Sequence, residues 1–249
     1  MYQSSSEILR KTVDALRASR RVVVLTGAGT SAESGIPTFR EAQTGLWSRY
    51  DPQELATPQA FAANPQLVWE WYAWRRQLIA EAGPNPAHYA LANLQRHVAS
   101  LTLITQNVDG LHQRAGSTGV VELHGNIGRT ICSLERIAVE SWPETDQVPP
   151  LCPNCQAPLR PDVVWFGESL PSEAVDTAVH AAGICDLFFS IGTSALVQPA
   201  ASLAHIALQK GAKVAELNAE PTPLTPYADF TLFGQAGELL PGLNDCLPS

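Results

Sequence analysis

A chain of 249 residues with 45% hydrophobic and 16% charged residues is typical of a folded globular protein with one large core and room for a smaller one. The net charge of −8, with 16 Lys and Arg residues spread thinly, argues against a nucleic-acid partner and suits a basic substrate such as a lysine-bearing peptide. The sequence has no signal-peptide pattern and no uncharged apolar stretch of about 18 residues, so we expect a cytoplasmic protein without membrane contact, and a monomer.

The apolar pattern predicts helices in alternation with short buried strands over most of the chain. The predicted helices are 5–19, 66–82, 86–98, 111–113, 172–182, 199–210 and 237–246, with a further one that begins near Pro58. The predicted strands are 22–25, 101–104, 120–125, 187–191, 214–217 and one near Phe230. Residues 45–47 and 51–57 are interpreted as a surface loop that could fold over a ligand. This order predicts an α/β fold with a doubly wound, Rossmann-like parallel sheet, which binds ligands at the carboxyl ends of its strands.

Two stretches differ in character from the rest of the chain. Residues 51–83 are helical and rich in tryptophan, and residues 126–160 contain clustered prolines, three cysteines and no regular periodicity. We interpret these as small inserted modules, the second of zinc-ribbon type. The Rossmann-like part of this single catalytic domain then comprises about 1–50, 84–125 and 161–249.

A glycine-rich turn, Gly27-Ala28-Gly29-Thr30-Ser31, follows the first predicted strand. Glycine lacks a Cβ atom, so Gly27 and Gly29 can take positive φ and let backbone N–H groups approach a pyrophosphate. By itself this pattern also fits a plain tight turn, and the third glycine of the usual motif is replaced by Ala32.

Three further segments carry a more specific signal. Residues 32–40 match the first signature of the sirtuin family, the NAD-dependent protein deacylases. Gln106-Asn107-Val108-Asp109-Gly110-Leu111-His112 and Glu122-Leu123-His124-Gly125 resemble the second and third signatures. Gly192-Thr193-Ser194 and Asn218-Ala219-Glu220 follow in the family's order, so the resemblance extends from about residue 5 to 247.

The resemblance implies that NAD is bound and that an acyl group moves from lysine to its ADP-ribose part. The acyl-lysine carbonyl oxygen displaces nicotinamide to leave an alkylimidate, and His124 then accepts a ribose hydroxyl proton. An imidazole with a pKa near ~6.5 suits general-base work at neutral pH. Asn107 would order ribose and water, and Asp109 would bind the nicotinamide carboxamide. The products would be free lysine, nicotinamide and O-acyl-ADP-ribose.

The family's NAD-contacting positions can be carried over one by one. They are Gly27, Ala28, Gly29, Thr30, Ser31, Glu33, Pro37, Thr38, Phe39, Arg40, Trp47, Gln106, Asn107, Val108, Asp109, Gly192, Thr193, Ser194, Asn218, Ala219, Glu220 and Ala236. Phe39 would cover the reacting centre and Arg40 would lie near phosphate.

Tyr72 and Arg75 lie at i and i+3 and therefore share one face of a predicted helix. On pattern alone this could be a packing face with a solvated head. The pair also resembles the Tyr-x-x-Arg element of sirtuins that remove malonyl and succinyl groups, in which an arginine fork binds the acyl carboxylate. Ala56 matches the same class and leaves room for a longer acyl chain. Residues 163–168 resemble the edge segment of sirtuins, which implies that Val163, Val164, Phe166, Gly167 and Glu168 pair the substrate peptide as an added strand.

The cysteine pattern departs from the family. Cys152-Pro153-Asn154-Cys155 has zinc-knuckle spacing, but the earlier half, Cys132-Ser133-Leu134-Glu135, supplies one thiol and a carboxylate. Structural zinc is nearly always four-coordinate, and carboxylates are uncommon in such sites. Two alternatives stay open: a zinc site in which Glu135 replaces a cysteine, or a module that has lost its metal and is held by packing.

The sequence leaves two other functions to compare with a deacylase acting on acylated-lysine proteins. One is an NAD glycohydrolase or ADP-ribosyltransferase, and the other is a non-catalytic NAD or ADP-ribose sensor. A sensor would be expected to lose the histidine or the Asn-x-Asp loop, and both are present.

Overall fold

The computed structural model describes residues 5–37, 50–144 and 146–246. Its centre is a six-stranded parallel sheet in the order β3-β2-β1-β6-β7-β8. The strands are β1 (Arg21–Thr26), β2 (Ser100–Thr105), β3 (Val121–Glu122), β6 (Leu187–Ile191), β7 (Lys213–Asn218) and β8 (Phe230–Phe233). The predicted α/β parallel sheet is therefore confirmed.

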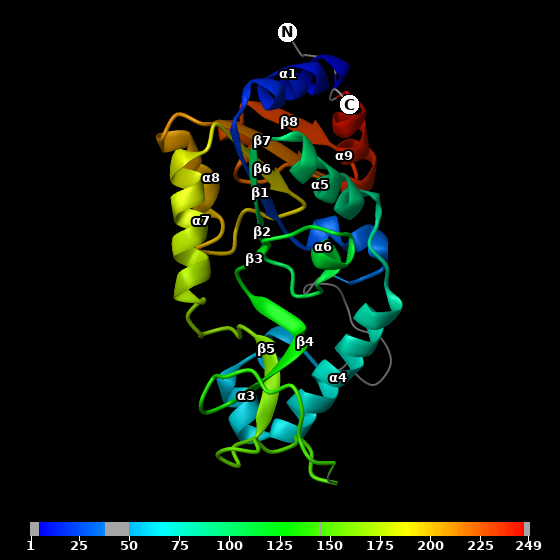
Figure 1. Cartoon of the computed structure of the whole chain (residues 1–249), viewed down its shortest axis with the longest axis vertical. Coiled ribbons are helices and arrows are strands. Elements are labelled where there is room, and N and C mark those ends of the chain that lie inside the picture. The colour runs from blue at the N-terminus through cyan, green and yellow to red at the C-terminus, as the bar shows by residue number, and fades with distance from the viewer. Residues whose placement is uncertain (1–4, 38–49, 145, 247–249) are drawn as a thin grey trace.

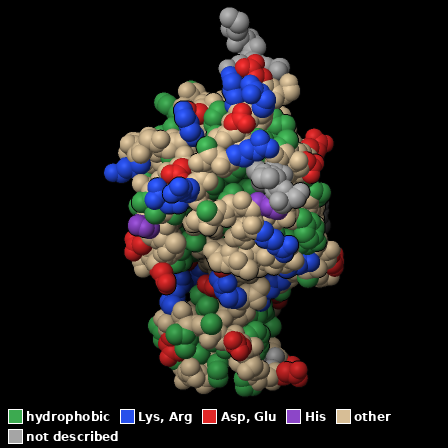
Figure 2. Space-filling model, turned by 45° about the horizontal axis from the view of Figure 1, so that its top comes forward, with side chains coloured by type: hydrophobic (Ala, Val, Ile, Leu, Met, Phe, Trp, Pro, Cys, Tyr) green, Lys and Arg blue, Asp and Glu red, His purple; other side chains and the backbone are tan. Residues whose placement is uncertain are grey.

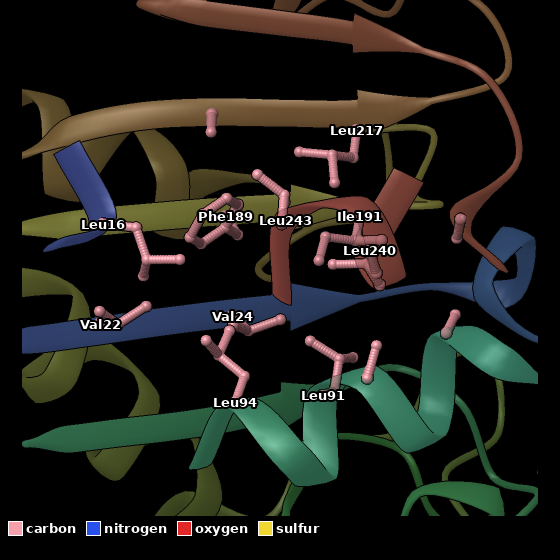
Figure 3. Close-up of a cluster of buried hydrophobic side chains, with 14 of the residues drawn as sticks. Leu16, Val22, Val24, Leu91, Leu94, Phe189, Ile191, Leu217, Leu240 and Leu243 are labelled. Carbon is pink, nitrogen blue, oxygen red and sulfur yellow. The ribbon is translucent and has the colours of Figure 1, made fainter. Parts of the chain in front are cut away.

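Helices cover both faces of this sheet (Figure 1). One face packs against α1 (Ser5–Ala18), α5 (Pro86–His97) and α9 (Ala236–Asp245), and the other against α7 (Ser172–Ile184) and α8 (Ser202–Gln209). The central strands β1 and β6 are buried on both faces, which explains their apolar runs. Leu16, Val24, Leu91, Phe189 and Leu240 come from five of these elements and meet in one cluster (Figure 3).

A second, smaller domain lies below the sheet in Figure 1. It contains α3 (Pro58–Ala63), α4 (Pro65–Glu81) and the antiparallel pair β4 (Gly125–Cys132) and β5 (Leu159–Val163). Its core is aromatic and includes Phe61, Trp71, Tyr72 and Trp165. The strand β5 straddles the predicted boundary near residue 160 and pairs with β4, not with the large sheet.

Three local expectations were wrong. Residues 51–57 include a short helix, α2 (Pro52–Leu55), because Asp51 caps it by accepting a hydrogen bond from the Gln53 N–H and proline occupies its first turn. The expected strand 120–125 is split, since the chain turns at Leu123 and His124 between β3 and β4. The cysteine module is not irregular throughout, because it begins and ends in β4 and β5.

The remaining short elements connect these parts. In the part of the chain that the structure describes, they are α6 (Leu111–Arg114) and the 3-10 helices Ala28–Thr30, Ala32–Ser34 and Thr225–Tyr227. On the face shown in Figure 2, Lys and Arg side chains are interspersed with Asp and Glu, which agrees with the thin spread of basic residues in the sequence. Within the described residues, every helix is too short or too polar to cross a bilayer.

Candidate functional site

The strand order reverses direction at β1, which has β2 on one side and β6 on the other. At such a reversal, an open parallel sheet binds ligands in a crevice at the carboxyl ends of its strands. Two cavities of about 400 Å³ and 480 Å³ lie there, and both are lined by Gly29 and Gly192. An extended ligand could cross from one cavity to the other at these two glycines.

The glycine-rich turn is built for close backbone contact and not for left-handed geometry. Gly27 has a φ of −130°, and Gly29 is also outside the positive-φ residues, so the expectation of positive φ was wrong. The Gly29 N–H donates to the Gly192 oxygen at 2.8 Å. A Cβ atom at Gly27 would lie 2.8 Å from that oxygen, and one at Gly29 would lie 2.8 Å from the Gly192 Cα. Glycine is required because two loops touch there.

A buried hydrogen-bond network organises the polar end of the 480 Å³ cavity. The Asn85 N–H donates to His88 Nδ1 at 3.2 Å, which leaves the His88 Nε2–H to donate to Ser31 Oγ at 3.3 Å. Ser31 in turn donates to Asp109 Oδ2 at 2.7 Å, and Asn107 Nδ2 donates to Ser31 Oγ at 3.0 Å. Burial raises the pKa of Asp109, and its hydrogen bonds only partly offset this. The network therefore fixes Asn107 and Asp109 in position at the wall of the cavity.

His124 lies at the turn between β3 and β4 and lines the same cavity. Its Nδ1 is 2.9 Å from the Gln106 carbonyl oxygen, and a carbonyl can only accept, so Nδ1 carries the proton. Nε2 is then an unprotonated base. Burial lowers the pKa of His124 from its usual range, and the Gln106 hydrogen bond opposes this in part. The side chain is therefore neutral near pH 7 and able to take a proton at Nε2.

The opposite wall comes from the small domain. Ala56, Arg75, Val163, Trp165 and Phe166 all line the cavity. Arg75 is buried, and burial lowers the pKa of its guanidinium, although an arginine still stays protonated at neutral pH. A buried positive charge in a cavity wall favours an anionic ligand.

The structure brings most of the predicted site residues together. Those that line the larger cavity are Gly27, Ala28, Gly29, Ser31, Pro37, Ala56, Arg75, Gln106, Asn107, Val108, Asp109, His124, Val163, Val164, Phe166, Gly167, Glu168, Gly192, Thr193 and Ser194. Those that line the smaller cavity are Gly29, Glu33, Gly192, Asn218, Ala219 and Ala236.

Three predicted residues lie elsewhere among the described positions. Thr30 is buried and its hydroxyl donates to the Ile191 oxygen, so it joins the two loops from behind. Glu220 is exposed beside the smaller cavity's loop. Tyr72 is 1% exposed and is buried behind the wall, with its hydroxyl 3.0 Å from Trp165 Nε1. Thr38, Phe39, Arg40 and Trp47 lie outside the described residues.

Sequence reasoning missed His88 and Trp165. His88 belongs to no recognisable motif. Its place three residues after the N-cap residue Asn85 was the one signal that it could accept the Asn85 backbone N–H in a capping box. Trp165 lies within the recognised edge segment, but the sequence analysis gave it no role.

The cysteine module collects the expected ligands. The ligand atoms of Cys132, Glu135, Cys152 and Cys155 all lie within 4.8 Å of one another. The two sulfurs of Cys132 and Cys155 are 3.4 Å apart, close to the ~3.8 Å between thiolates bound to one tetrahedral zinc. The Glu135 N–H also donates to Cys132 Sγ at 3.3 Å. Three thiolates and one carboxylate therefore fit a zinc ion, which would tie β4 to the 152–155 turn.

Comparison with known proteins agrees with this geometry. Residues 27–199 match the Sir2 family. NAD-dependent protein deacylase 2 of Pyrobaculum aerophilum is 54% identical over 231 residues, covering 92% of each chain. NAD-dependent protein deacylase 1 of Pseudomonas aeruginosa is 49% identical over 243 residues, covering 94% of this chain and 97% of that one.

Solved structures lead to the same family. A Sir2 homologue in complex with NAD superposes with a TM-score of 0.88 at 49% identity, covering 95% of this chain and 92% of that chain. A Sir2 protein with a deacetylated p53 peptide and 3'-O-acetyl ADP ribose superposes with a TM-score of 0.82 at 34% identity, covering 95% and 97%. This chain belongs to the Sir2 family, the sirtuins.

Proposed function

We propose that this chain is an NAD-dependent deacylase that removes succinyl and malonyl groups, and also acetyl groups, from lysine side chains of proteins. Relatives of about 50% identity carry the name NAD-dependent protein deacylase, and related structures hold NAD or acetyl ADP-ribose. The observation that carries the proposal is the meeting of His124, Asn107 and Asp109 in one cavity at the strand ends.

NAD would span the two cavities. Asn218, Ala219 and Ala236 would hold the adenosine half. The phosphates would lie next to Gly29 and Gly192, where the two cavities meet. When bound, NAD supplies a nicotinamide–ribose bond whose cleavage lets ADP-ribose take the acyl group. Asp109 would accept the carboxamide N–H groups of nicotinamide, because its position is fixed by Ser31 and by the Leu111 N–H at 2.9 Å.

His124 supplies the proton acceptor. Its Nδ1–H is held by the Gln106 carbonyl, so Nε2 is left as a base of fixed orientation on a side chain that lines the cavity. A base held in this way accepts a hydroxyl proton without first rotating or changing tautomer.

The acidic-acyl preference rests on Arg75. A guanidinium binds a carboxylate through two parallel hydrogen bonds, and a charge-assisted hydrogen bond contributes ~1.5–3 kcal/mol. Succinyl-lysine has this carboxylate, whereas acetyl-lysine does not. Arg75→Met keeps the apolar stem and should lower kcat/KM for succinyl-lysine by roughly 10- to 150-fold, with little change for acetyl-lysine.

The direct experiment incubates the protein with NAD and with acetyl-, malonyl- or succinyl-lysine peptides. We expect peptide deacylation coupled one-to-one to nicotinamide release, fastest for an acidic acyl group. NAD loss without peptide change would favour a glycohydrolase, and no reaction with retained ADP-ribose binding would favour a sensor. Equal loss of both activities in Arg75→Met would contradict the acidic-acyl preference.

A further inference from the structure

Trp165 forms the part of the cavity wall between Arg75 and the small-domain core. It lines the cavity yet is only 2% exposed. The Phe61 ring lies 5.1 Å from it between centroids, and the Tyr72 ring is stacked at 6.4 Å. The Arg160 guanidinium carbon lies 3.2 Å from the indole centroid. The indole is therefore packed against two aromatic rings and a guanidinium.

A buried ion pair fixes the Arg160 side of this arrangement. Arg160 donates to both oxygens of Glu168, at 2.7 Å and 2.9 Å, and to the Val163 carbonyl at 2.8 Å. The same carboxylate accepts the backbone N–H of Trp165 at 2.9 Å. Glu168 thus holds both the guanidinium that covers the indole and the backbone that carries it. Burial alone would raise the pKa of Glu168, but the Arg160 and Trp165 hydrogen bonds outweigh it and keep the carboxylate ionised.

The indole also determines that the Tyr72 hydroxyl accepts, and does not donate, in the hydrogen bond between them. An indole N–H can only donate, so at 3.0 Å the Tyr72 oxygen is the acceptor. Tyr72 must then give its own proton to another group, and within the described residues its one hydrogen bond is the one from Trp165. Burial raises the pKa of Tyr72, so the hydroxyl stays protonated. Arg75, which lines the cavity, is one helical turn away on α4.

We propose that Trp165 and Arg160 are positioning residues for acyl selectivity. The indole N–H occupies the accepting side of the Tyr72 hydroxyl. Tyr72 itself lines neither cavity, and its proton is left for a carboxylate that Arg75 would bind at the wall one helical turn away. Arg160, paired with Glu168, keeps the indole in the position that this requires. The inference rests on the proposed acidic-acyl preference and adds two residues that do not touch the acyl carboxylate but set the donor that does.

Trp165→Phe is the sharpest test, because it keeps an aromatic ring against Phe61 and Arg160 and removes the N–H together with the second ring of the indole. We expect kcat/KM for succinyl-lysine to fall about 3- to 10-fold more than kcat/KM for acetyl-lysine, mainly through KM. Trp142→Phe is the matched control, because Trp142 packs on Trp69 in the cysteine module and lines neither cavity. It should change neither activity.

A double-mutant cycle separates positioning from packing. If the indole acts through the hydroxyl, Trp165→Phe combined with Tyr72→Phe should be no slower on succinyl-lysine than Tyr72→Phe alone. Arg160→Lys, which loses the planar fork but keeps the charge, should lower the succinyl-to-acetyl ratio about 2- to 5-fold. Thermal unfolding shows whether each variant is folded. If Arg160→Lys does not fold, the double-mutant cycle of Trp165 and Tyr72 still tests the inference.

The outcomes distinguish this inference from the function on which it rests. If the wild-type protein deacetylates but does not desuccinylate, both the acidic-acyl preference and this inference are wrong. Wild-type protein that prefers succinyl-lysine, with a Trp165→Phe variant that loses both activities in equal proportion, overturns the inference alone. Additive effects in the double-mutant cycle would do the same.

Discussion

The two halves of the cavity are built in different ways. The sheet half is made largely from backbone: the loops after β1 and β6 touch through Gly29 and Gly192, and His124 is oriented by the Gln106 carbonyl. The small-domain half is made from side chains, with Trp165 held between Tyr72 and Arg160. Under the proposed function, the first half would serve the cofactor chemistry and the second would set the acyl selectivity.

The largest effect is expected in the sheet half, at His124. His124→Ala removes the base while leaving the Asp109 network and both glycine loops in place. We expect deacylation to fall about 10²- to 10⁴-fold, with ADP-ribose affinity, measured by calorimetry, within a few-fold of wild type. If turnover stays within a few-fold of wild type, His124 is not the base.

The second prediction concerns the stability of the sheet half in acid. His88 and His112 are buried with ring centroids 4.8 Å apart. Burial lowers the pKa of His88 to about 4, and burial together with the nearby His88 lowers that of His112 to about 3. Both values lie below the ~6.5 of an unfolded histidine, so the unfolded chain binds more protons and stability falls as pH falls.

Between pH 6.5 and 4 the loss should be of order 3 kcal/mol for each histidine, because one pKa unit corresponds to ~1.4 kcal/mol. Urea unfolding at several pH values measures it. His112→Gln, which retains a polar side chain toward Thr26, should flatten the dependence in this range. An unchanged slope would mean that the buried pair does not set the acid stability of this half.

The sequence predicted the sheet half well because its elements carry local signals. Strands such as β1 and β6 are continuous apolar runs, and the residues that follow them form recognisable motifs. Asn107, Asp109 and His124 were expected to meet, because the carboxyl ends of parallel strands share one edge. What failed was local geometry: Gly29 is required by contact with a loop 163 residues further along the chain, which no local pattern reveals.

The small-domain half was predicted less completely, for the same physical reason. Tyr72 and Arg75 share a helix face, so their spacing is visible in the sequence. The ion pair of Arg160 with Glu168, and the stacking of Arg160 on Trp165, depend on a turn whose course the sequence does not specify. The same holds for His88, because a single buried histidine produces no periodic pattern in the sequence. Contacts between side chains on different elements could therefore not be predicted from the sequence.

A third prediction tests the contact between the two glycine loops. Gly192 has a φ of +58°, and a Cβ atom there would lie 2.4 Å from the Thr30 backbone nitrogen. Gly192→Ala should weaken ADP-ribose binding roughly 10- to 100-fold, because left-handed strain of ~1–3 kcal/mol is added where the two cavities meet. Gly183→Ala is the control, since Gly183 lies in α7 with no atom within 4 Å of the added Cβ. It should raise stability slightly and leave affinity unchanged.

The smallest effect on catalysis is expected at the cysteine module, because none of its four candidate ligands lines a cavity. Cys132 and Cys152 are fully buried, whereas Glu135 is exposed. If they hold zinc, the purified protein should contain close to one equivalent. Glu135→Gln should release zinc at about 10-fold lower chelator concentration, because it removes one charged ligand, while kcat/KM of zinc-loaded protein stays within about twofold.

Two matched variants sharpen this last prediction. Glu140→Gln changes an exposed acidic residue of the same module and should not alter zinc retention. Glu135→Cys supplies the fourth thiolate and should retain zinc against more chelator than wild type, because thiolates suit zinc better than carboxylates in structural sites. Metal-free wild-type protein with full activity would favour a module held by packing alone. Equal zinc retention in Glu135→Gln and wild type would remove Glu135 from the ligand set and leave three thiolates to hold the ion.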